Sequence, residues 1–158
     1  MGDRMDVGIV WQDHIELGSK SSFIKKLGEF DLGRIPTSPG IYIFARKFGN
    51  NLAPIYIGKA TNLRSRVKTQ LNNHRLLDAI ANEKSGDRVL LLGIIKSNSE
   101  NLLAKKLNLA ERTHIDHALT AGFEIVNVQL TKGPINTIRT LGTKRQNHPF
   151  PHVMLSKH

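Results

Sequence analysis

The sequence predicts an α+β domain, and three stretches of the chain carry that prediction. Residues 40–44 (GIYIF) and 55–58 (IYIG) are short runs of β-branched and aromatic residues, which favour the pleated surface of a strand. The run 89–95 is apolar without alternation, as expected of a strand that is covered on both faces. Helical periodicity is clearest over residues 100–120. Strands and helices are therefore expected in one domain.

The first two runs predict a β-hairpin whose loop, residues 46–54, contains Gly-Asn-Asn and a proline. Successive side chains of a strand point to opposite faces of a sheet. The tyrosines of the two strands, Tyr42 and Tyr56, are therefore expected to emerge together, and the chain has no other tyrosine. The opposite face would carry the isoleucines of both strands, Ile41, Ile43, Ile55 and Ile57.

A helix is expected directly after the second strand, with Thr61 or Asn62 as its N-cap. Its apolar stripe has the spacing i, i+4 and i+8, at Leu63, Val67 and Leu71. On a helical wheel at about 100° per residue, Arg66 lies on one side of this stripe. Arg64 and Lys68 lie on the other side, so the three cations do not serve one site.

The sequence GIY, followed by YIG and then by K-A-x-N-L-x-x-R, closely resembles the GIY-YIG endonuclease family. It looks most like the N-terminal incision domain of the bacterial nucleotide-excision-repair nuclease. The resemblance covers roughly residues 35–130 and implies a small three-stranded antiparallel sheet flanked by helices. Residues 1–34 and 131–158 would then be short N- and C-terminal extensions. By spacing from Tyr56, the family's arginine matches Arg66 and its lysine matches Lys59.

The helix over residues 100–120 carries a carboxylate, Glu111, in its apolar face, with Leu107 one turn before it and Ile115 one turn after it. A charge in such a place is costly without a cation or several hydrogen bonds. A structural ion pair with a lysine or arginine is one explanation. The resemblance implies the other, that Glu111 is the family's metal ligand.

Two further residues have both a functional and a structural interpretation. His114 follows Glu111 at i+3, which is a spacing that metal ligands use, but a buried histidine with satisfied hydrogen bonds explains it as well. Asn127 is the candidate for the family's asparagine, which would orient the site, or else it is an asparagine at the end of a strand.

The formal net charge of the chain is +10, and the excess is unevenly placed. Residues 1–40 carry five Lys and Arg against six Asp and Glu, residues 41–130 carry 13 against seven, and residues 131–158 carry five against none. A basic excess of this kind suits binding to nucleic-acid phosphates, although a basic surface of a soluble protein has the same charge. The candidates for such contacts are Arg64, Lys68, Lys132, Arg139, Lys144 and Arg145.

The predicted activity is metal-dependent hydrolysis of DNA, double-stranded or branched, in repair or restriction. Mg²⁺ is the expected ion, with Mn²⁺ as the alternative, because Glu111 supplies oxygen and one carboxylate leaves room for water. Tyr42 is assigned as general base, Tyr56 as a residue that orients water or phosphate, and Lys59 and Arg66 as the cations that stabilise a phenolate. The roles of the tyrosines are exchangeable.

Two other classes of function are considered. A nucleic-acid-binding module with the same fold would not cut DNA, and an interaction protein would use both tyrosines as ordinary strand residues. No run of residues reaches the roughly 18 apolar positions of a membrane helix, no secretory signal is recognisable at the N-terminus, and cysteine is absent. A cytoplasmic protein without membrane contact is expected.

Overall fold

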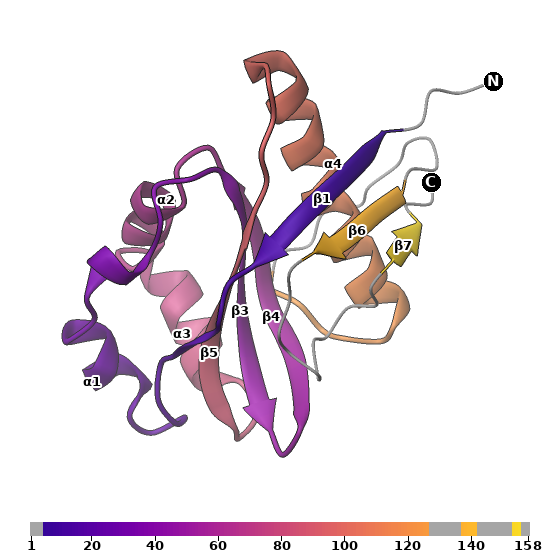
Figure 1. Cartoon of the computed structure of the whole chain (residues 1–158). Helices are drawn as coiled ribbons and strands as arrows, with labels where there is room; N and C mark the ends of the chain where they lie inside the picture. The colour runs from indigo at the N-terminus through magenta and orange to yellow at the C-terminus, as the bar shows by residue number, and fades with distance from the viewer. Residues whose placement is uncertain (1–4, 127–136, 142–152, 156–158) are drawn as a thin grey trace.

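The computed structural model describes residues 5–126, 137–141 and 153–155 (Figure 1). The elements, in chain order, are β1 (Asp6–Trp11), β2 (Ile15–Glu16), α1 (Phe23–Gly28), the 3₁₀ helix η1 (Leu32–Arg34), β3 (Gly40–Phe48), β4 (Asn51–Ala60), α2 (Leu63–Gln70), α3 (His74–Asn82), β5 (Asp87–Ile94), α4 (Glu100–Thr120), β6 (Thr137–Leu141) and β7 (Val153–Leu155). The expected α+β fold is confirmed.

The strands that the structure describes form one sheet with the order β4-β3-β5-β1-β6-β7, and β2 also pairs with β5. Its centre is the expected antiparallel unit of three strands, in which β3 pairs with β4 on one side and with β5 on the other. Helices α1, α2 and α3 cover one face of this unit, and α4 covers the other (Figure 1). Two apolar clusters result, one on each face of the sheet.

The N-terminal segment covers the outer edge of β5. Val10 of β1 pairs with Ile94 of β5, and Ile15 of β2 pairs with Leu90 of β5. Between the two strands, the Gln12 N–H donates to the Leu92 carbonyl at 2.9 Å. An exposed strand edge is a template for pairing with other chains, so this cover protects β5. The described part of the N-terminal extension thus covers an edge of the sheet.

The predicted hairpin exists, but the prediction of a loop over residues 46–54 is wrong. Strand β3 continues to Phe48 and β4 begins at Asn51, so a two-residue turn joins them, with Gly49 at a φ of 60°. Pro54 lies within β4, which is the edge strand of the sheet. An edge strand tolerates proline because the missing N–H is not needed for a ladder on that side.

The register of the hairpin shifts between Phe44 and Ala45, because Phe44 faces Tyr56 whereas Ala45 faces Pro54. The shift leaves Ile55 as an extra residue, and an extra residue breaks the alternation of side chains. The prediction that Ile55 shares a face with Ile57 is therefore wrong. Ile55 packs on the side of α2 and α3, whereas Ile57 packs on the side of α4.

Helix α3 ends against a buried arginine that the sequence patterns did not single out. Arg88 in β5 is fully buried, and its five N–H groups donate to main-chain carbonyls. The acceptors are Ile80, Ala81, Glu83, Lys84 and Gly86. These include carbonyls at the end of α3 that have no partner within the helix. Burial lowers the pKa of Arg88, which fits a structural role for its guanidinium.

Candidate active site

The two tyrosines meet on one face of the hairpin, as the alternation predicted. Tyr42 in β3 and Tyr56 in β4 pack in the same apolar cluster, and their ring centroids are 6.0 Å apart. Tyr42 pairs across the hairpin with Gly58. A Cβ at position 58 would overlap the ring and hydroxyl of Tyr42, so only glycine leaves room for this ring. The glycine of the YIG sequence thus places Tyr42.

A buried glutamine connects the two phenols. Gln70, in the last turn of α2, is 4% exposed, and its Nε2 donates to the Tyr42 hydroxyl at 2.7 Å and to the Tyr56 hydroxyl at 3.4 Å. Its Oε1 accepts from Asn73 Nδ2 at 3.2 Å. The sequence analysis missed Gln70. The available signal was a polar residue beside the apolar stripe of α2, seven positions after Leu63.

The environments of the two tyrosines differ. Tyr42 is fully buried, whereas Tyr56 is partly exposed. Burial raises the pKa of Tyr42 to about 12, and the opposing effects of Gln70 and Arg66 are smaller. Arg66 thus lowers the pKa of Tyr42, as expected of a nearby cation, but burial outweighs this effect. At neutral pH Tyr42 is a protonated phenol.

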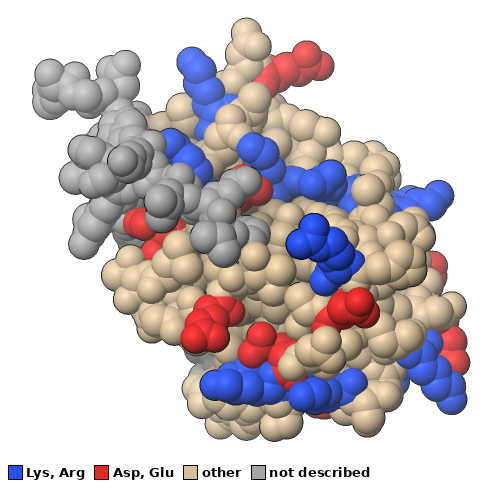
Figure 2. All heavy atoms as spheres, turned by 180° about the vertical axis from the view of Figure 1, so that it is seen from behind, with Lys and Arg blue, Asp and Glu red and all other residues tan. Residues whose placement is uncertain are grey.

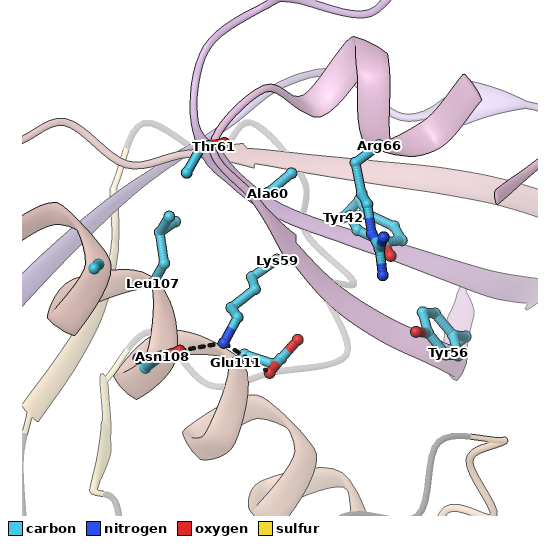
Figure 3. Close-up of a pocket in the computed structure, with 10 residues that line it drawn as sticks. Tyr42, Tyr56, Lys59, Ala60, Thr61, Arg66, Leu107, Asn108 and Glu111 are labelled. Carbon is cyan, nitrogen blue, oxygen red and sulfur yellow. Dashed lines mark hydrogen bonds and ion pairs between the residues drawn. The ribbon is translucent and has the colours of Figure 1, made fainter. Parts of the chain in front are cut away.

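The helix α2 supplies one cation to the tyrosines. Asn62 caps it, and the cap oxygen accepts the Ser65 N–H at 3.0 Å. Arg66 is exposed and extends toward Tyr42 (Figure 3). Hydrogen bonding to Tyr42 and attraction to it raise the pKa of Arg66.

The other two cations of α2 lie elsewhere, as the helical wheel predicted. Arg64 donates to the Ile35 carbonyl at 2.7 Å and to the Gly33 carbonyl at 3.4 Å, so it fastens the segment before β3. Neither Arg64 nor the exposed Lys68 lines the pocket that holds the tyrosines. Their proposed contacts with nucleic acid stay a prediction.

Glu111 reaches the same site from α4, which begins after the N-cap Ser99. Its side chain is 16% exposed, and burial raises the pKa of Glu111, while the Lys59 ammonium opposes that shift. Lys59 Nζ lies 3.7 Å from Glu111 Oε1 and also donates to Asn108 Oδ1 (Figure 3). Lys59 is thus directed at the carboxylate. The ion pair that the sequence offered as a structural explanation is present.

Asn108 is a second site residue that the sequence analysis missed. It precedes Glu111 by three residues, so the two side chains lie on one side of α4. That spacing was the available signal. Asn108 and Glu111 together present two oxygen-bearing side chains beside the Lys59 ammonium.

One pocket of about 510 Å³ between α2, α4 and β4 collects these groups (Figure 3). Its polar lining consists of Tyr42, Tyr56, Lys59, Thr61, Arg66, Asn108 and Glu111. Five of the six residues assigned to catalysis from the sequence are among them. The sixth, Asn127, lies outside the described residues, as do Lys132, Lys144 and Arg145. Arg139 falls in β6, of which only the backbone is described.

His114 lies outside this pocket. It is fully buried, its Nδ1 lies 2.7 Å from the Ala110 carbonyl, and its ring packs edge-on against Trp11 at 5.8 Å. Its burial agrees with the interpretation as a buried histidine. Among the described residues, no group of three or more His, Asp or Glu side chains is placed to hold a metal.

The charged side chains are spread unevenly over the surface. Seen from behind, Lys and Arg side chains run across the upper half of the molecule with some acidic side chains among them, and acidic and basic side chains mix more evenly below (Figure 2). Such a basic band suits the phosphate backbone of a nucleic acid.

None of the helices that the structure describes is long and apolar enough to cross a membrane.

Comparison with known proteins finds relatives for part of the chain. The chain is 39% identical over 82 residues to UvrABC system protein C of Petrotoga mobilis. The aligned region covers 49% of this chain and 13% of the relative. The protein of the same name from Deinococcus radiodurans is 68% identical over 37 residues, 23% of this chain and 5% of the relative. That from Chlorobium chlorochromatii is 47% identical over 58 residues, 36% of this chain and 9% of the relative.

The chain thus spans only a small part of the length of these relatives. No protein-family model and no solved structure matches it. The matches to UvrABC system protein C confirm the resemblance that the GIY, YIG and K-A-x-N-L-x-x-R motifs indicated, and the α+β architecture is consistent with the GIY-YIG fold.

Proposed function

We propose that this chain, a relative of the GIY-YIG segment of UvrABC system protein C, is a metal-dependent endonuclease that hydrolyses DNA phosphodiester bonds. The observation that carries the proposal is the convergence of two tyrosines, an arginine, a lysine and a carboxylate on one pocket. They come from β3, β4, α2 and α4, so four separate elements contribute side chains to the same space.

DNA is the proposed substrate, in double-stranded or branched form. The relatives by name belong to the UvrABC system, which supports a domain like that of a DNA-repair nuclease. The net charge of +10 and the basic band of Figure 2 support binding to a polyanion.

The chemistry of the pocket fits a hard divalent cation. Glu111 and Asn108 supply carboxylate and amide oxygens, which Mg²⁺ and Mn²⁺ accept, and a site with so few protein ligands leaves positions for water and phosphate. The ion would polarise the phosphate and screen the charge on the leaving 3′ oxygen. Lys59 holds the carboxylate and the amide side by side, and an ion bound to these two oxygens would replace the ammonium as their cation.

The burial of Tyr42 supports assigning the general base to Tyr56, which is the exchange of roles that the sequence left open. Tyr56 is the more exposed phenol, and as a phenolate it would accept the proton of the attacking water. The Gln70 N–H at 3.4 Å would hold its oxygen, and Arg66 supplies positive charge beside the tyrosine pair. Tyr42 stays protonated and anchors Gln70.

Arg66 has a second role in this proposal. It is an exposed guanidinium at the mouth of the pocket, and its fork of N–H groups suits the non-bridging oxygens of a phosphate. Negative charge grows on these oxygens as water attacks. A donor fixed before the reaction stabilises that charge at little cost in reorganisation.

A plasmid-nicking assay with and without Mg²⁺ tests the proposal. The unsubstituted chain should nick DNA only with the metal, and Glu111→Gln should abolish nicking. Glu124→Gln, at an exposed carboxylate just after α4, is the matched control and should nick normally. The ion pair with Lys59 also suits a module that binds DNA without cutting it. Binding without nicking by the unsubstituted chain would favour that module.

A further inference from the structure

A second pocket lies beside the proposed active site, against the first turns of α4. Its volume is about 450 Å³, and it is formed by residues 38–39 before β3, by residues 94–98 at the end of β5 and just after it, and by one side of α4. Its polar lining consists of Ser38, Ser97, Asn98, Lys96 and Lys106. None of the residues that line it is acidic.

Two lysines define the charge of this pocket. Lys106 is partly buried, and its Nζ donates to the Lys96 carbonyl at 3.4 Å, which holds the ammonium at the pocket wall. Lys96 itself is exposed. An ammonium that is held in place loses little freedom when it binds an anion, so this arrangement favours binding. The hydroxyls of Ser38 and Ser97 and the Asn98 amide add uncharged donors.

The main chain fixes this pocket relative to the active site. The Ile95 N–H donates to the Pro39 carbonyl at 3.0 Å, and the Leu63 N–H, at the start of α2, donates to the Ser38 carbonyl at 3.0 Å. On α4, Leu103 lines the second pocket, whereas Ala104 and Leu107 line the active site. Neighbouring residues of α4 therefore line different pockets, so the two pockets border different sides of this helix near its start.

A DNA strand carries one phosphate per about 3.4 Å of rise along the duplex, so DNA in the active site also brings phosphates to the surface around it. We infer that the pocket around Lys96 and Lys106 binds a backbone phosphate of the DNA that the proposed active site holds. This inference rests on the proposed function and extends it, because it assigns a second subsite on the DNA to residues outside the reaction centre. The site would set the position of the strand.

The test is the salt dependence of DNA binding, measured by fluorescence anisotropy with a labelled DNA duplex in EDTA, where no cleavage occurs. Each phosphate contact contributes about 0.9 to the slope of log K against log salt. Lys96→Gln/Lys106→Gln should lower this slope by about one and weaken binding about tenfold at low salt. Lys96→Gln alone, at an exposed position, should show part of the effect in a chain whose fold is undisturbed.

The control has the same change of charge on the side of the molecule that carries α1 and α3. Lys25→Gln/Lys84→Gln removes two exposed lysines there and should leave the slope unchanged. Equal slopes for the two double variants would overturn the inference, as would absence of DNA binding by the unsubstituted chain. If that chain binds with the expected slopes but fails to nick DNA with Mg²⁺, the endonuclease proposal fails and the phosphate site stands.

Discussion

The ring of Tyr42 lies directly over the backbone of Gly58, its partner across the hairpin, in the space where any other residue would place a Cβ. This contact joins the two motifs of the sequence, because the tyrosine of GIY needs the glycine of YIG. The position of the Tyr42 phenol depends on this contact. The position of Tyr56 depends on it through Gln70, which donates to both hydroxyls.

Gly58→Ala should therefore displace Tyr42 and destabilise the protein. Overpacking in a core costs about 1–3 kcal/mol, which urea denaturation measures. Gly28→Ala is the control, because no atom lies within 4 Å of a Cβ at that position of α1, and it should be neutral or slightly stabilising. Equal stability of both variants would show that the contact is not tight.

The titration of the phenols should separate the two tyrosines. The chain has only two, so ultraviolet absorbance follows both. In Tyr56→Phe the remaining phenol is Tyr42, which should ionise near its pKa of about 12. Because that pKa is raised above the unfolded value of about 10, Tyr42 stabilises the fold below pH 10 and this stability is lost as pH rises toward 12. Ionisation near pH 10 in that variant would contradict the buried position.

The assignment of the general base predicts unequal effects on cleavage. Tyr56→Phe should lower the rate by about 10²–10⁴, the usual contribution of a positioned base. It should also remove the pH dependence of the rate. Tyr42→Phe keeps the ring and removes only the anchor of Gln70, so its rate should fall less and keep its pH profile. The reverse order in single-turnover kinetics would return the base to Tyr42.

Glu111→Gln should leave the fold as stable as before or more stable, although it abolishes nicking. Burial raises the pKa of Glu111, so its carboxyl contributes most stability at low pH and progressively less as pH rises through that pKa. At neutral pH the substitution removes a desolvated charge, and Lys59 at 40% exposure remains hydrated. Thermal melts should also lose any stabilisation by Mg²⁺. A lower melting temperature without metal would mean that the ion pair with Lys59 holds the fold together.

Arg88→Lys should be strongly destabilising, although both side chains carry one positive charge. Lysine has three donors on a flexible stem, so several of the five carbonyls that Arg88 satisfies would lose their partner inside the protein. The expected loss is about 3 kcal/mol or more in urea denaturation. Arg75→Lys, on the exposed side of α3, should change stability by less than about 0.5 kcal/mol.

The main elements and most of the site could be predicted from sequence patterns. Tyr42 and Tyr56 belong to stretches that alternate, residues 40–44 and 56–60, and Glu111 interrupts the apolar face of a long helix. These patterns follow from the period of two residues in a strand and of 3.6 residues in a helix. They can therefore be recognised in the sequence without knowledge of the fold. The same periods separated Arg66 from Arg64 on α2.

The environments of these residues depend on tertiary packing. The bulge at Ile55 depends on the pairing of two strands, and the burial of Tyr42 depends on α2 packing over β3 and β4. Gln70 and Asn108 joined the site because helices distant in sequence brought them to the tyrosines and to Lys59. A pKa is set by desolvation and by neighbours in space, which no spacing along the chain reveals. For that reason the sequence indicated a tyrosine pair, whereas the fold distinguished its two members.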